Sequence, residues 1–145
     1  MEILLILVAT FFSTTMMTLF SYAVSASFRD LYKEPVLLQY VMDGLDIELN
    51  KKYRPFISWI VHYLIGLLFV ACYFFLSWID YYKITWLSGI VFGAVGGVAG
   101  IVGWMGMFRI SQRKPMLHPS AYYLQLFIAH LIFGITTAGI YFMVN

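Results

Sequence analysis

Two histidines are the residues of this chain whose type and spacing point most directly to chemistry. The motif His-x-x-x-Gly, followed by Tyr-Phe seven residues after the glycine, occurs twice: His62, Gly66, Tyr73, Phe74 and His130, Gly134, Tyr141, Phe142. Both copies lie in apolar segments long enough to cross a bilayer, where an ionisable residue is a functional hypothesis by default. The shared register predicts a duplicated helical hairpin with its two histidines at similar depth.

The composition predicts the elements that carry these histidines. Of 145 residues, 62% are hydrophobic and 11% are charged, whereas about a quarter of the residues of a soluble domain are charged. Four stretches can each supply the roughly 20 helical residues that fill a hydrocarbon core: residues 3–28, 55–79, 84–108 and 119–144. We therefore expect an all-α membrane protein, one transmembrane domain of four spanning helices. The remaining segment, 29–54, should lie at the cytoplasmic interface and carry a short amphipathic helix that starts at Pro35.

The distribution of cations predicts the orientation. Lys and Arg near span ends are retained on the cytoplasmic side, and eight of the nine cations follow the first and third spans: Arg29, Lys33, Lys51, Lys52, Arg54, Arg109, Arg113 and Lys114. The second connection holds only Lys83. We therefore expect a protein of the bacterial inner membrane with both termini on the side away from the cytoplasm. A net charge of +2 is too small to indicate a nucleic-acid partner.

Small residues predict how the helices pack. In lipid, close backbone approach at small side chains supplies much of the packing energy. Hydroxyl residues on the first span match glycines on the third at a constant offset of 79: Thr10, Thr14, Thr18 and Ser21 against Gly89, Gly93, Gly97 and Gly100. We expect these faces, together with Gly66 and Gly134, to form the helix interfaces. Trp104, near a span end, is expected to be an interfacial anchor.

The polar residues inside the spans leave three interpretations open. The candidate ligand-binding or polar-core residues are His62, His130, Thr14, Thr18, Ser21, Tyr73 and Tyr141. In the first interpretation the histidines bond to hydroxyls or carbonyls and join helices. In the second they are the axial ligands of haem b in an electron-transfer protein. In the third the hydroxyl residues from Thr10 to Ser25, with Thr136 and Thr137, line a small channel or proton path.

Enzymatic chemistry finds little support in the sequence. The carboxylates outside the spans form no recognised catalytic spacing, and the chain has no phosphate-binding loop and no cysteine cluster. Cys72 is single and is expected to serve packing. His118 precedes Pro119 at a span start and should be solvated rather than a metal ligand. We therefore expect neither a catalytic site nor a metal site.

Several short runs carry a family resemblance. These are Thr18-Leu19-Phe20-Ser21-Tyr22, Glu34-Pro35 with Leu37-Leu38, Trp59-x-x-His62-Tyr63-x-x-Gly66 and Gln125-x-x-x-Ala129-His130-x-x-x-Gly134. They resemble small bacterial inner-membrane proteins of the YagU type. The resemblance implies a four-helix polytopic protein and assigns no catalytic residue. The sequence thus favours a non-enzymatic bundle that binds a lipid or small ligand, or that associates with a second copy or another membrane protein.

Overall fold

The computed structural model describes residues 2–47, 50–112 and 115–144, and the described chain is helical without strands. In chain order the helices are α1 (Glu2–Phe28), α2 (Glu34–Gly44), α3 (Arg54–Trp78), α4 (Trp86–Ile110) and α5 (Pro119–Val144). The helices α1, α3, α4 and α5 are long and apolar enough to cross a membrane. The prediction of an all-helical protein with four candidate spans is therefore confirmed.

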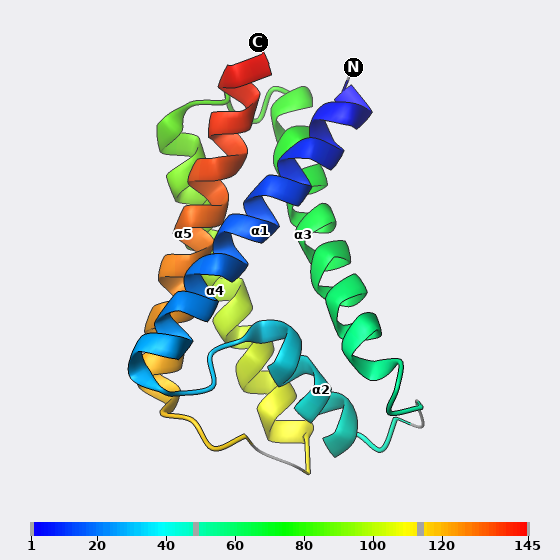
Figure 1. Ribbon diagram of the computed structural model, residues 1–145. Helices are drawn as coiled ribbons and strands as arrows, with labels where there is room; N and C mark the ends of the chain where they lie inside the picture. The colour runs from blue at the N-terminus through cyan, green and yellow to red at the C-terminus, as the bar shows by residue number, and fades with distance from the viewer. Residues whose placement is uncertain (1, 48–49, 113–114, 145) are drawn as a thin grey trace.

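The long helices form a bundle that is closed at one end and splayed at the other. Both termini lie at the closed end, and α2 lies at the opposite end between α3 and the other helices (Figure 1). Helix α5 packs extensively on α4 and on α1, whereas α3 packs less closely on α1. The structure therefore widens beside α3 on the side where α2 docks.

Local sequence signals explain where the helices begin and end. Proline occupies the first turn of both α2 and α3, where its missing N–H costs no helical hydrogen bond. Helix α4 begins with a capping box in which Thr85 and Ser88 each accept from the other's backbone amide. Helix α3 ends with Asp80 at φ 56° and a hydrogen bond of 3.0 Å from the Tyr81 amide to the Leu76 carbonyl.

The core has two parts along the bundle axis. Toward the termini, Ala9 and Met17 of α1 pack with residues of α3 and α5. At the α2 end, the core consists of Tyr32, Leu37, Val41, Trp104, Tyr122 and Leu126. Helix α2 thus buries its apolar side against protein. Trp104 is 8% exposed, so its expected role as an interfacial anchor is wrong: docking of α2 covers the ring.

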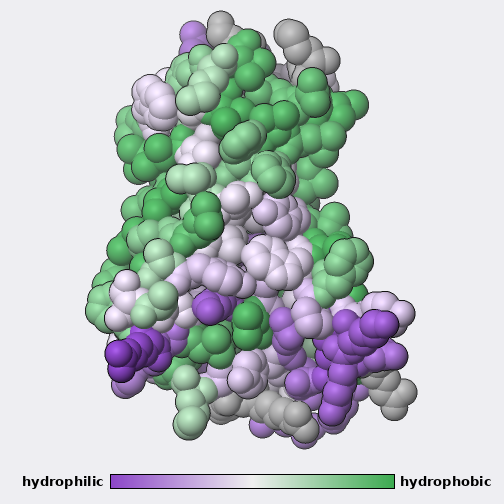
Figure 2. Space-filling view, viewed as in Figure 1, coloured by the Kyte–Doolittle hydropathy of each residue, from purple (hydrophilic) through white to green (hydrophobic). Residues whose placement is uncertain are grey.

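The outer surface has the polarity expected of a bundle in lipid. Hydrophobic side chains cover the terminal end and the flanks of the visible face, a band of near-neutral residues crosses its middle, and hydrophilic side chains gather at the end formed by α2 and the neighbouring connections (Figure 2). Large apolar side chains on the spanning helices point outward, among them Leu4, Leu64, Val95 and Leu124. The exposed apolar surface is therefore a belt around the long helices.

Candidate functional site

Helices α4 and α5 meet through glycines, which brings their backbones together. A Cβ at Gly134 would collide with the Gly89 carbonyl oxygen and the Gly93 amide, and a Cβ at Gly93 would lie 2.5 Å from the carbonyl oxygen of His130. One turn further on, a Cβ at Gly97 would lie 2.8 Å from the Phe127 ring. This contact fixes α5 tightly against α4 and directs the His130 ring toward Gly100.

Helices α1 and α3 meet through hydroxyl groups instead. Thr14 places its Oγ1 against Gly66, where a Cβ would collide with it. One turn away, Thr18 Oγ1 lies 2.9 Å from His62 Nε2. The first hairpin is therefore joined by side chains where the second is joined by backbone.

The two histidines lie at the same level of the bundle. Two hydrogen bonds set the register between α1 and α5: Ser21 with Gln125, and Ser13 with Thr137. Because His130 lies between those bonds on α5, it falls opposite the middle of that stretch of α1, near Met17. His62 bonds to Thr18, the next residue on α1. Both imidazoles point into the protein at this level.

A cavity of about 240 Å³ lies between the histidines. We call it the histidine cavity; its lining comes from all five helices and includes Thr14, Glu34, His62, Gly103, Trp104 and His130. Its rim includes Ile65, which is exposed, and the exposed Gly103. The histidine cavity therefore reaches the surface between α3 and α4, within the apolar belt.

Glu34 is the site residue that the sequence analysis missed. Its side chain is 2% exposed, and its Oε1 accepts a hydrogen bond of 2.7 Å from Ser21, which in turn accepts one of 2.6 Å from Gln125. Its Oε2 is buried and has no hydrogen-bond partner among the described residues. Burial raises the pKa of the Glu34 carboxyl to about 7, against a smaller lowering effect of the Ser21 hydrogen bond.

The hydrogen-bond partners show which ring nitrogen of each imidazole carries the proton. Thr18 donates its single proton to the Thr14 carbonyl at 2.6 Å, so His62 Nε2 must be the donor to Thr18. His130 Nδ1 lies 2.8 Å from the Leu126 carbonyl, which can only accept. In a neutral imidazole the second nitrogen carries a lone pair. His62 Nδ1 and His130 Nε2 are then hydrogen-bond acceptors.

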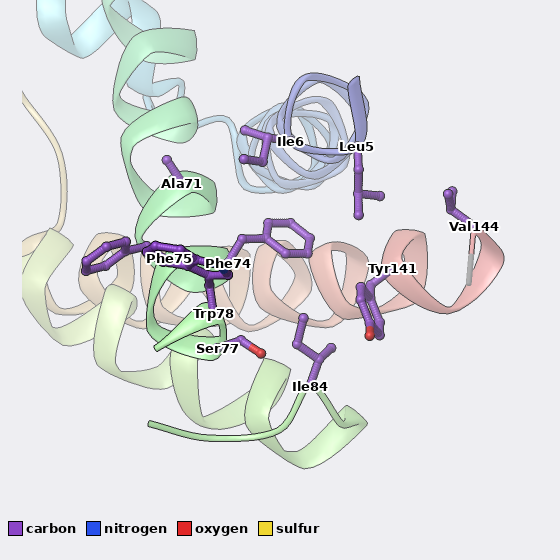
Figure 3. Close-up of a pocket in the computed structure, with 10 residues that line it drawn as sticks. All are labelled: Leu5, Ile6, Ala71, Phe74, Phe75, Ser77, Trp78, Ile84, Tyr141 and Val144. Carbon is purple, nitrogen blue, oxygen red and sulfur yellow. The ribbon is translucent and has the colours of Figure 1, made fainter. Parts of the chain in front are cut away.

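The predicted site residues separate into two groups. Thr18 bonds to His62, Thr14 lines the histidine cavity, and Ser21 bonds to Glu34 at the same end of the bundle. Tyr73 lies at the other end of the bundle, where its hydroxyl is 2.8 Å from Ser88 Oγ. Tyr141 lies there too, lining a different cavity of about 410 Å³ with Phe74 and Trp78 (Figure 3). The structure does not bring either tyrosine to the histidines.

The cavity at the terminal end is larger but carries less chemistry. Its lining is mostly aliphatic and aromatic, with Ser77 and Tyr141 as its polar side chains (Figure 3). None of the described residues that line it carries a carboxylate or an imidazole. The histidine cavity, which has both, is therefore the stronger candidate site.

His118 stands apart from both cavities. Its side chain is 81% exposed, and its Nδ1 lies 3.1 Å from Asp30 Oδ2. Hydrogen bonds from Tyr32 and His118 hold the pKa of Asp30 below its usual value. This contact ties the start of α5 to the segment after α1 and lies outside the four candidate spans.

The geometry does not fit bis-histidine haem. A Cβ at Gly100 would lie 2.9 Å from Cε1 and 3.1 Å from Nε2 of His130, so a macrocycle bonded to Nε2 would overlap α4. His62 Nε2 is bonded to Thr18. The cavity volume also falls below the roughly 300–1,000 Å³ of sites for drug-sized ligands.

A continuous hydroxyl-lined path also lacks support. Ser13 and Thr137 are buried and bond to each other at 2.9 Å, and α1 packs closely on α5 at this point. These hydroxyls close the bundle between the histidines and the terminal end. Comparison with protein-family models, curated proteins and solved structures finds no match, so the geometry alone carries the functional argument.

Proposed function

We propose that this chain is a non-enzymatic multi-pass membrane protein that binds a small amphipathic molecule in the histidine cavity. The observation that carries the proposal is a pair of buried polar atoms, Glu34 Oε2 and Thr14 Oγ1, that have no partner among the described residues and belong to side chains lining a mostly apolar cavity. An unpaired buried polar atom costs about 1–3 kcal/mol. A ligand that bonds to these atoms removes that cost.

The shape of the cavity suits a ligand that is mainly apolar. Phe69, Phe133 and Trp104 supply aromatic surface, and the polar groups converge from one side chain each on α1, α2, α3 and α5. Such a division between apolar walls and a few polar groups is typical of small-molecule sites. The ligand would be oriented by its polar end and held by its apolar body.

Access from the lipid supports the same proposal. An apolar groove of about 980 Å³ continues along α3 and α4 toward Lys83 and shares Phe69 and Ala99 with the histidine cavity. An amphipathic molecule dissolved in the bilayer would reach the cavity sideways without crossing the headgroup region. We therefore place the entrance between α3 and α4.

Filling the cavity tests the proposal. A Cβ at Gly103 meets no atom within 4 Å, so Gly103→Phe should occupy the entrance without disturbing helix packing. Gly106 has equally open surroundings but does not line the cavity, which makes Gly106→Phe the matched control. The full chain in nanodiscs should bind 2-phenylethanol or phenethylamine by calorimetry after subtraction of empty nanodiscs. Gly103→Phe should lose that binding and Gly106→Phe should keep it. No binding to wild type, or equal binding to both variants, would contradict the proposal.

We also propose the finer architecture: two duplicated hairpins, with both termini outside the cytoplasm of a bacterial inner membrane. The paired contacts Thr14 with Gly66 and Gly93 with Gly134 support duplication because they occupy matching positions. The described cations near α2 support the orientation; Arg113 and Lys114 lie outside the described residues. A cysteine at position 51 in a Cys72→Ser background should resist an impermeant thiol reagent in intact cells. Labelling there would invert the orientation.

A further inference from the structure

The histidine cavity contains a buried carboxylate within mostly apolar walls. Glu34 is the single carboxylate among the described residues that line it, and none of those residues is Lys or Arg. The neighbouring cation, Lys33, places its ammonium group 4.9 Å from the centre of the Tyr22 ring. No described ion pair involves Glu34. The carboxylate is thus buried without a cationic partner from the described chain, which is rare in proteins.

The hydrogen-bond inventory of the cavity is dominated by acceptors. Glu34 Oε2 is unpartnered, and the proton assignment makes His62 Nδ1 and His130 Nε2 acceptors as well. Thr14 Oγ1 has no partner in the described part of the chain and can accept or donate. A ligand that complements this set must bring several donors on one small group.

We propose that the cavity binds a small primary amine in its protonated form, with the ammonium group on Glu34 and the apolar body against Phe69, Phe133 and Trp104. This inference rests on the proposed function and names the chemical class of its ligand. An ammonium group carries three donors and a positive charge, and charge-assisted hydrogen bonds to a carboxylate are about twice as strong as neutral ones. Aromatic faces beside the cation add a favourable electrostatic contact.

The volume limits the size of the amine. An apolar cavity of about 150 Å³ is known to hold a benzene molecule, and the histidine cavity has about 240 Å³. One aromatic ring therefore fits in the cavity, and the remaining volume can hold a two-carbon arm with an amino group. A longer alkyl body would extend through the opening between α3 and α4 into the groove that shares Phe69 and Ala99.

The Glu34 carboxyl makes the affinity of the cavity for the amine depend on pH. Its pKa of about 7 in the folded protein, raised by burial, means that ligand binding at pH 6 must first remove a proton. At pH 8 the carboxylate is already charged while a primary amine is still protonated. The other titratable groups near Glu34 are Tyr22, Tyr122, His62 and His130.

Two ligands that share one body test the inference. Phenethylamine and 2-phenylethanol differ in the ammonium and hydroxyl groups, and calorimetry on the full chain in nanodiscs measures both. We expect the amine to bind at least tenfold more tightly than the alcohol at pH 8, and this preference to shrink at pH 6. Glu34→Gln should reduce amine affinity at pH 8 by tenfold or more, to that of the alcohol for wild type. Asp46→Asn, at an exposed carboxylate outside the cavity, should change neither affinity.

Each outcome separates the two proposals. Binding of both ligands with equal affinity in wild type overturns the amine inference and leaves the cavity proposal standing, and this comparison needs no variant. Unchanged amine affinity in Glu34→Gln also overturns it. If neither ligand binds wild type, the proposed function fails and the inference fails with it.

Discussion

The two hairpins of this protein carry the same histidine-glycine motif but pack by different means. In the α4–α5 hairpin, glycine faces glycine, and the backbone of one helix lies against the other. In the α1–α3 hairpin, Thr14 and Thr18 stand between the helices and contact Gly66 and His62 through their hydroxyls. Helix α1 therefore has threonines where α4 has glycines, and its contact with α3 is polar and more open than the contact between α4 and α5. The histidine cavity lies on the open side.

The segments that connect the two helices of each hairpin also differ, and the more open hairpin has the longer one. Residues 111–118 join α4 to α5 directly, whereas the longer segment between α1 and α3 contains α2. Helix α2 fits into the splayed end, delivers Glu34 into the bundle, and ties itself to α3 through an ion pair between Asp43 and Arg54. The tight hairpin therefore acts as a scaffold, and the open hairpin supplies the room and the carboxylate.

The largest effect is expected where the seam is tightest. Gly93→Leu places a branched side chain against the His130 carbonyl, where even a Cβ lies 2.5 Å away, and no rotamer avoids the backbone. We expect a loss of about 3 kcal/mol or more, seen as a strongly lowered melting temperature in mild detergent. Val91→Leu, at a side chain that is 53% exposed, is the control and should change little. Equal tolerance at both positions would mean that the glycine face does not carry the packing.

The next effect comes from Glu34, the feature present in one hairpin and not in the other. A glutamate releases its proton near pH 4.5 in the unfolded chain and near pH 7 in the folded protein. The folded state therefore binds more protons between these values, so stability falls as pH rises from 4.5 to 7 and is level above 7. At about 1.4 kcal/mol per unit, the full loss is about 3 kcal/mol.

Melting curves between pH 4.5 and 8.5 measure this dependence. Glu34→Gln resembles the protonated carboxyl, so the variant should match wild type at low pH and exceed it above pH 7. The difference between the two proteins isolates the contribution of Glu34, because every other titratable group is the same in both. Parallel curves for wild type and variant would contradict the burial of an unpaired carboxylate.

The sequence could predict the spans and their contact faces because these depend on local composition and on helical periodicity. The small residues at intervals of three and four, such as Gly93 and Gly97, needed no knowledge of the fold. Tyr73 and Tyr141 lie away from the histidine cavity for a reason that geometry explains: eleven residues of helix separate each from its histidine, about 16 Å at 1.5 Å per residue. Residues on the same helix face can therefore lie at different positions along the bundle axis.

Glu34 could not be predicted because its burial depends on tertiary structure. In sequence it precedes Pro35 at the start of a short amphipathic helix, where an acidic residue is ordinary. Its burial follows from the way α2 docks between α3 and α4, which no local pattern encodes. The same docking covers Trp104, whose position near a span end suggested an interfacial ring. Long-range packing therefore decides the chemistry of the cavity.

The smallest effect offers the sharpest comparison, because it places one substitution at matching positions of the two hairpins. Gly66→Ala and Gly134→Ala each add one methyl group to a crowded contact. At Gly66 the close atom is the Thr14 hydroxyl, with the Thr14 Cβ at 3.4 Å, whereas at Gly134 the close atoms belong to the backbone of Gly89 and Gly93.

A hydroxyl can rotate away, so Gly66→Ala should cost about 1 kcal/mol. Backbone cannot rotate away, and Gly134→Ala should cost two to three times as much. Adding Thr14→Ala removes the obstructing oxygen, after which Gly66→Ala should become neutral or stabilising because alanine favours a helix over glycine by about 1 kcal/mol. No such rescue is expected for Gly134→Ala from Gly89→Ala, since the carbonyl oxygen stays in place. Unfolding of wild type, the four single variants and the two double variants in mixed micelles gives the coupling energies directly. Equal costs for the two substitutions, or no coupling between positions 14 and 66, would mean that both hairpins are held by the same kind of contact.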